Sequence, residues 1–244
     1  MLKQLALAGV LAAAGTFLMW PGQPSGRLVR TYGDLATAGR VAVVVPGADT
    51  TVATFDHGTK RPGGAARALM AEAARLAPGE RLAVVAWLGY DSPPTLSIGV
   101  VTHDAADAGA AELRRTVADL RTRTAAPIVL LCHSYGSVLC AKAAAAGLPV
   151  TDLAVFGSPG LDVPSADALP PRVWAGLGDN DWIRFVPKTK IGPLGFGADP
   201  MSPGFGARVF EAGPGGHSDY FSPGTPSLRN LTMIALGRWD RVTS

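Results

Sequence analysis

Short apolar runs alternate with longer amphipathic stretches along most of this chain. The runs are continuous rather than alternating, rich in β-branched residues, and fall at residues 40–45, 82–88, 127–132, 153–156 and 172–177. Helical spacing of apolar positions follows at 64–76, 105–123 and 227–236. Continuous apolar runs are typical of strands buried on both faces of a parallel sheet. The pattern therefore predicts an α/β fold, a mostly parallel central sheet with helices on both faces.

One domain accounts for the whole pattern, residues 1–244, because no internal repeat or linker interrupts it. Residues 186–207 are rich in glycine and proline and predict a long loop before a last short strand at 208–211. This loop either caps a pocket with Phe196 and Phe205 or is plain surface loop.

The first 32 residues allow two interpretations. Residues 1–15 form an apolar segment with one positive charge, which suits a signal peptide or membrane anchor. Alternatively, a short helix at 5–14 and a strand at 16–20 precede a turn at 21–26 and a second strand at 27–32. We favour the hairpin, because no Ala-x-Ala cleavage site with a polar spacer follows the apolar segment.

Composition excludes several classes of function. The net charge of +3 comes from arginines scattered along the helical stretches, without the basic run of a nucleic-acid-binding protein. Neither a cluster of metal ligands nor a glycine-rich phosphate loop is found, so no metal and no cofactor is expected. Cys132 and Cys140 predict two buried thiols rather than a disulfide. We favour a cytoplasmic location, with secretion or membrane anchoring through the N-terminal segment as the alternative, so membrane contact stays open.

The sequence Leu-Leu-Cys-His-Ser-Tyr-Gly-Ser-Val at residues 130–138 carries most of the chemistry. A buried strand ends abruptly in this stretch and a helix begins at once, as at the strained turn that presents a serine nucleophile in the α/β-hydrolase fold. Strand and helix nearly touch there, so the positions two before and two after the serine must be small. Gly136 and Cys132 meet this requirement. Ser134 is therefore the predicted nucleophile.

In this fold the triad runs nucleophile, acid, histidine along the chain. His217 follows the last strand, where the general base belongs, whereas His57 and His103 precede the nucleophile and His133 is expected to be structural. The acid should follow the strand at 172–177, which favours Asp181 and leaves Asp179 and Asp199 as alternatives.

Acyl transfer also needs donors for the developing oxyanion. The N–H of Tyr135, directly after the nucleophile, should be one. The second should come from the loop after Val45, where Gly47 lets the backbone turn and aim the Ala48 N–H. The same loop is also consistent with a turn that caps a helix, with Asp49 or Thr50 as the N-cap residue.

With these pieces placed, the chain resembles an actinobacterial α/β-hydrolase family of serine-hydrolase type. The resemblance spans nearly the whole chain from about residue 17 and is carried by seven blocks, at residues 33–38, 45–47, 86–91, 132–137, 156–160, 181–183 and 216–220. It implies Ser134 as nucleophile and His217 as base, and the Asp-Trp-Ile form favours Asp181 over Asp179. It implies no substrate.

The resulting hypothesis is a serine esterase that takes a small-molecule acyl substrate, with thioesters or amides open to the same machinery. The alternatives are an acyltransferase and a non-catalytic binding protein on a hydrolase fold. Trp87 is expected to lie in the core. Tyr90 and Asp91 fall at the active-site edge of the sheet, where they either contact substrate or serve a turn.

Overall fold

The computed structural model describes residues 26–95, 104–188, 190–191 and 194–244. Their centre is a seven-stranded sheet with the order β1-β3-β2-β4-β5-β6-β9. The strands are β1 (Leu28–Tyr32), β2 (Arg40–Val45), β3 (Leu82–Leu88), β4 (Ile128–His133), β5 (Asp152–Phe156), β6 (Arg172–Gly176) and β9 (Arg208–Val209). Only β1 in this sheet runs antiparallel to its neighbour, β3. The predicted α/β fold with a mostly parallel sheet is confirmed.

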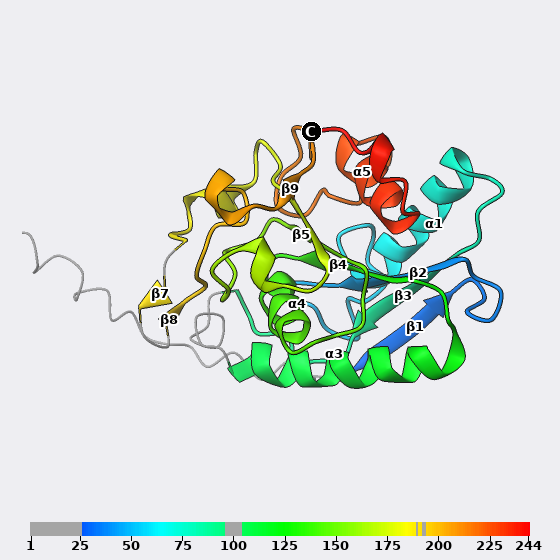
Figure 1. The fold of residues 1–244 in the computed structure, drawn as a ribbon, viewed down its shortest axis with the longest axis horizontal. Helices are drawn as coiled ribbons and strands as arrows, with labels where there is room; N and C mark the ends of the chain where they lie inside the picture. The colour runs from blue at the N-terminus through cyan, green and yellow to red at the C-terminus, as the bar shows by residue number, and fades with distance from the viewer. Residues whose placement is uncertain (1–25, 96–103, 189, 192–193) are drawn as a thin grey trace, which may run out of the picture.

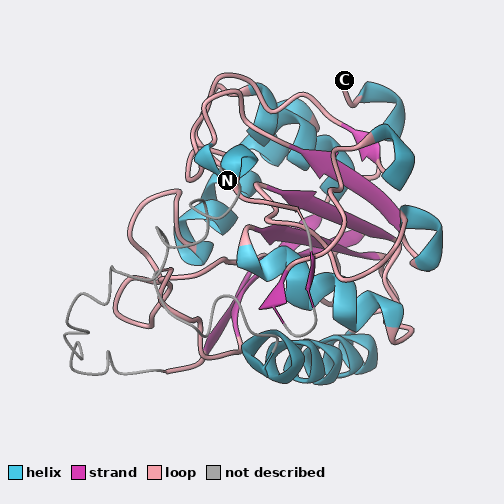
Figure 2. Ribbon diagram, turned by 90° about the vertical axis from the view of Figure 1, so that its left-hand side faces the viewer, coloured by secondary structure: helices cyan, strands magenta, loops and turns pink. Residues whose placement is uncertain are grey.

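The four α-helices among the described residues cover the two faces of the sheet (Figure 1). They are α1 (Pro62–Leu76), α3 (Asp104–Arg123), α4 (Tyr135–Ala145) and α5 (Pro226–Ala235). Helices α3 and α4 pack together on one face, and α1 packs with α5 on the other. Figure 2 shows the strands between these two groups. Strands β3, β4 and β5 are buried almost throughout, which explains their continuous apolar sequences.

Local sequence explains where helix α5 begins and which side of α3 is buried. Helix α5 starts after Thr225, whose side chain accepts a hydrogen bond from the N–H of Leu228, and Pro226 occupies the first helical turn. Helix α3 buries Leu113, Val117 and Leu120, the positions that its apolar spacing predicted. Its remaining surface carries four arginines and four acidic residues, so this helix adds nothing to the net charge of the chain.

Predicted and observed element bounds agree within a few residues for the strands of the sheet and for α1, α3 and α5. The strand expected at 27–32 is β1, which pairs with β3. Its expected hairpin partner at 16–20 and the helix at 5–14 lie outside the described residues. The long loop contains short elements: β7 (Lys190–Ile191), β8 (Leu194–Gly195) and the 3-10 turn η3 (Pro203–Phe205).

The remaining 3-10 turns are η1 (Ala166–Ala168), η2 (Trp182–Phe185) and η4 (Trp239–Arg241). None of the helices among the described residues has both the length and the apolar character needed to cross a membrane.

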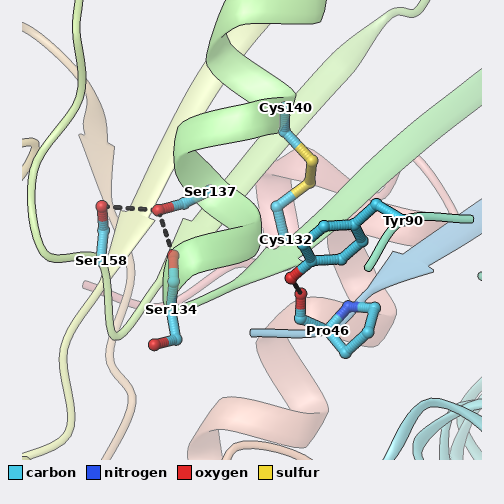
Figure 3. The surroundings of a disulfide bond; sticks show 7 residues. All are labelled: Pro46, Tyr90, Cys132, Ser134, Ser137, Cys140 and Ser158. Atoms are coloured by element: carbon cyan, nitrogen blue, oxygen red, sulfur yellow. Dashed lines mark hydrogen bonds between the residues drawn. A yellow bond between two sulfur atoms is a disulfide. The ribbon is translucent and has the colours of Figure 1, made fainter. Parts of the chain in front are cut away.

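The prediction of two free thiols is wrong. Cys132, near the end of β4, and Cys140, in α4, form a disulfide with their Cα atoms 6.6 Å apart (Figure 3). The chain reverses at Ser134, so the helix returns over the strand and brings the two side chains within bonding reach. A spacing of eight residues does not reveal this contact, because it depends on the angle between strand and helix.

Candidate active site

Ser134 occupies the turn between β4 and α4 with φ 52° and ψ −128°, a region that residues with a Cβ rarely adopt. Its backbone is held from both sides. The Ser134 N–H donates to the carbonyl of Phe156 at 3.0 Å, and the Ser137 hydroxyl donates to the Ser134 carbonyl at 2.6 Å. A Cβ on Gly136 would lie 2.4 Å from the carbonyl oxygen of Pro46, so this position must be glycine. The strained turn is thus enforced by its surroundings.

His217 lies beside this turn, in the loop between β9 and α5. Its Nε2 is 2.8 Å from Ser134 Oγ, and its Nδ1 is 2.8 Å from Asp181 Oδ1. Because a carboxylate can only accept, the Nδ1 proton points to Asp181 and Nε2 is left to accept the proton of Ser134. This is the geometry that general-base activation of a serine requires.

Asp181 is fully buried and follows β6 at the start of η2. The N–H of Ile183 donates to Oδ1 at 2.8 Å, and the hydroxyl of Tyr220 donates to Oδ2 at 2.5 Å. Burial by itself raises the pKa of Asp181, but the hydrogen bonds from His217, Tyr220 and Ile183 outweigh it and leave the pKa below its usual value. The acid is therefore held as a carboxylate facing His217.

Tyr220 is a positioning residue that the analysis of the sequence did not single out. Its ring is buried, and its hydroxyl accepts from the N–H of Gly178 at 3.1 Å while donating to Asp181. Gly157 makes room for this pair, since a Cβ there would lie 2.9 Å from Asp181 Oδ2. The signal available in the sequence was its place three residues after His217, within the 216–220 block.

Replacing Tyr220 by phenylalanine is expected to lower the free energy of unfolding by about 1.5 to 3 kcal/mol, the usual contribution of a hydrogen bond to a charged group. Since Asp181 then loses a donor, its carboxylate should attract the His217 proton more strongly. The acid limb of the kcat/KM profile should move to higher pH, and kcat should fall about tenfold. A pH profile that stays in place despite lost stability would mean that Tyr220 only packs.

His133 is structural, as predicted. Its Nε2 is 2.6 Å from the His217 carbonyl oxygen, and since a carbonyl can only accept, the ring donates from Nε2. Part of the side chain reaches the surface, but the ring packs among those of Phe156, Tyr220 and His217. Burial and the neighbouring His217 lower the pKa of His133 to about 3. It therefore stays neutral and supports the loop that carries His217.

The loop after β2 borders the nucleophile. A Cβ on Gly47 would lie 2.6 Å from Ser134 Cβ and 3.1 Å from Ser134 Oγ, so only glycine lets this backbone approach so closely. The N–H of the next residue, Ala48, has no hydrogen-bond acceptor among the described residues. Of the two predicted oxyanion donors, Ala48 therefore follows the glycine that approaches Ser134, and Tyr135 directly follows Ser134 in the chain.

Other candidates do not reach the site. Asp179 is exposed, and its N–H bonds the carbonyl of Gly213. Asp199 accepts from the N–H of Met201 within the long loop. His57 is exposed in the loop before α1, and His103 lies outside the described residues. Of the three acids considered, only Asp181 contacts His217.

The other residues singled out in the sequence lie either in the core or on the surface. Trp87 is fully buried, as expected, whereas Asp91 is exposed near Arg27. Phe196 and Phe205 are 7% and 2% exposed, so their side chains pack inward rather than present a cap to a substrate. Among the described residues, the exposed aromatics lie on η2 instead. They are Phe185 and Trp182, which is 47% exposed and has its ring centroid 4.6 Å from that of His217.

The candidate site residues Ser134, His217 and Asp181 meet at the carboxyl ends of β4, β5 and β6. This edge lies next to the point where the strand order reverses around β2. The sequence profile of the alpha/beta hydrolase family matches residues 22–191, and the chain belongs to that family.

The curated relatives are actinobacterial. The uncharacterized protein Rv2079 of Mycobacterium tuberculosis is 29% identical over 253 aligned residues, which cover 90% of this chain and 38% of the relative. The uncharacterized protein Rv0963c of the same organism is 34% identical over 160 residues, which cover 62% of this chain and 60% of the relative. This chain therefore spans well under half of the length of Rv2079.

Solved structures share the fold at low identity. The serine hydrolase XC6422 from Xanthomonas campestris, described as lacking a lid, superposes with a TM-score of 0.52 at 18% identity, over 90% of this chain and 96% of that one. A monoacylglycerol lipase from Paleococcus ferrophilus superposes with a TM-score of 0.51 at 11% identity, over 87% and 99%. Both comparisons support a hydrolase fold.

Proposed function

We propose that this protein is a serine hydrolase that cleaves carboxylic esters through an acyl-enzyme on Ser134. The observation that carries the proposal is the continuous hydrogen-bonded row from Ser134 Oγ through His217 to Asp181, with both contacts of His217 at 2.8 Å. The row starts at a serine on a strained turn, and its acid is buried and ionised. Each group is thus in the state that its role needs.

The reaction follows from this geometry. Ser134 Oγ attacks the acyl carbon and passes its proton to Nε2 of His217, while the charged imidazole is stabilised by Asp181. The N–H groups of Tyr135 and Ala48 hold the tetrahedral oxyanion. His217 then protonates the leaving alkoxide, which departs as the alcohol. A water molecule then attacks the acyl-enzyme and passes its proton to His217. His217 returns the proton to Ser134 Oγ as the carboxylic acid leaves.

The substrate is a small molecule with an apolar group beside the scissile bond. The half-exposed ring of Trp182 borders His217, and Phe185, which is 82% exposed, follows on the same 3-10 turn. Together they offer an apolar surface on the histidine side of the site.

A panel of p-nitrophenyl esters from acetate to octanoate tests the proposal, with a thioester and a p-nitroanilide of the same acyl group. We expect steady release of p-nitrophenol and carboxylic acid in equal amounts, with the longer esters preferred. Ester formation in added methanol at the expense of acid would favour the acyltransferase. A folded protein that turns over none of these compounds would favour a binding protein.

The Cys132–Cys140 disulfide bears on where the protein works. Disulfides persist in oxidising compartments and are rare in the cytosol. Both cysteines are fully buried, so once formed the bond is shielded from thiol exchange. The disulfide supports the exported or membrane-anchored alternative over the cytoplasmic location that we favoured from the sequence.

Alkylation of the denatured protein without reductant is expected to modify neither cysteine, and both after reduction. Protein taken from its native cells and quenched in acid should give this result by intact mass. Two modified cysteines in the unreduced sample would show that the thiols are free in the cell and would support the cytoplasmic alternative.

A further inference from the structure

The carbonyl of Gly47 lies within hydrogen-bond distance of three side-chain hydroxyl groups. The Oγ of Ser92 is 2.9 Å from the carbonyl oxygen, and the hydroxyl oxygens of Tyr90 and Thr50 are each 3.2 Å away. The Tyr90 hydroxyl also lies 3.0 Å from the carbonyl oxygen of Pro46 (Figure 3). Tyr90 and Thr50 are buried, so these contacts are sheltered from water.

Holding this carbonyl fixes the direction of the next N–H. In a trans peptide the C=O and N–H bonds point to opposite sides, and the carbonyl of Gly47 shares its peptide group with the N–H of Ala48. The three hydroxyl groups hold the Gly47 carbonyl oxygen on their side of the peptide group. The Ala48 N–H therefore points to the opposite side. The close approach of Gly47 to Ser134 places this peptide beside the nucleophile.

Tyr90 also contacts the second side of the oxyanion site. Its ring stacks on that of Tyr135, with centroids 6.3 Å apart and planes at 14°, and Tyr135 is the residue after the nucleophile. Burial raises the pKa of Tyr90 far above its usual value, so the hydroxyl stays a donor at any working pH. Tyr90 thus contacts the backbone of the loop that leads to Ala48 and the side chain of Tyr135.

We infer that Tyr90, Ser92 and Thr50 are positioning residues that aim the Gly47–Ala48 peptide at the oxyanion of the transition state. The inference rests on the proposed function. It gives a role to Tyr90, which lies in the 86–91 block of the family resemblance and was expected at the active-site edge of the sheet. The hydroxyl of Tyr90 is buried against the carbonyls of Pro46 and Gly47, so in this role it supports the loop rather than contacts substrate.

The test compares Tyr90→Phe, Ser92→Ala and the double variant with wild type on p-nitrophenyl butyrate. Removing a whole oxyanion donor lowers kcat by about 100- to 1,000-fold, so loosening one should lower it about 10-fold in each single variant and further in the double variant. KM should stay within about twofold, because the donor acts in the transition state. Tyr32→Phe is the matched control, since it removes a tyrosine hydroxyl that bonds Asp56 and Arg67 away from the site.

A trifluoromethyl ketone gives the readout that a packing role would not change. It forms a tetrahedral oxyanion on the serine, so its inhibition constant should rise by the same factor as kcat falls. Ser92→Ala removes little volume and keeps the test decisive if Tyr90→Phe fails to fold. Folded single variants with wild-type kcat and unchanged inhibition would overturn the inference while the hydrolase assignment stands. Wild-type protein that hydrolyses no ester would overturn both.

Discussion

Replacing Ser134 by alanine is expected to lower kcat by about 10⁴- to 10⁶-fold, because the variant has no nucleophile and only the oxyanion donors and substrate binding remain. The fold should survive. Alanine keeps the Cβ that the strained turn already accommodates, and the backbone bonds to Phe156 and Ser137 do not involve the lost hydroxyl. Initial rates on the preferred p-nitrophenyl ester and a thermal melt measure the two effects.

Ser202→Ala is the control for this variant. Ser202 is exposed, and its hydroxyl bonds the carbonyl of Asp199 within the long loop, so its loss should leave kcat within twofold of wild type. Turnover by Ser134→Ala within tenfold of wild type would show that another group performs the chemistry.

Asp181→Asn is expected to lower kcat by about 10⁴-fold, as loss of the carboxylate does in serine triads. The amide cannot both accept from Nδ1 of His217 and keep the Tyr220 and Ile183 donors satisfied. The imidazole then loses the partner that fixes its tautomer and stabilises its charged form. Substrate binding should change little, because Asp181 is fully buried.

Asp179→Asn, two residues earlier, is the matched comparison for this variant. Its side chain is exposed and contacts neither His217 nor Ser134 in the described structure, so kcat should change less than twofold. If Asp179→Asn lost activity and Asp181→Asn kept it, the assignment of the acid would be wrong.

The parts of the fold that the sequence predicted well are those governed by local patterns. Continuous β-branched runs require burial on both faces, and this located β2, β3 and β5 within one residue at each end. The serine turn was visible because its small residues and the abrupt change from strand to helix lie within nine positions, 130–138. The order of the residues along the chain and the positions of the loops were then enough to predict His217 as the base and Asp181 as the acid.

The features that the sequence did not predict depend on contacts between distant segments. Tyr220 reaches Asp181 across 39 positions, and Tyr90 reaches Gly47 across 43. Neither contact has a periodic signature. The disulfide is closer in sequence, but it depends on the angle at which α4 returns over β4. The aromatic residues of the long loop were ambiguous for the same reason, because glycine-rich sequence does not say which side chains turn inward.

The supporting residues explain how a strained serine turn is maintained. The backbone of Ser134 is fixed by Phe156 and Ser137, and Asp181 is fixed by Tyr220 and Ile183. These partners lie on β5, α4 and the loops after β6 and β9. The packed sheet and its connections therefore hold the reacting groups in fixed positions relative to one another.

Labelling with a fluorophosphonate probe, followed by intact mass, tests the central claim most directly. The probe reacts with a serine whose hydroxyl is activated by a base, and it needs no knowledge of the natural substrate. We predict one adduct on wild type, on Ser134, and none on Ser134→Ala. A folded wild-type protein that takes up no probe, or a Ser134→Ala variant labelled as fully as wild type, would contradict the account.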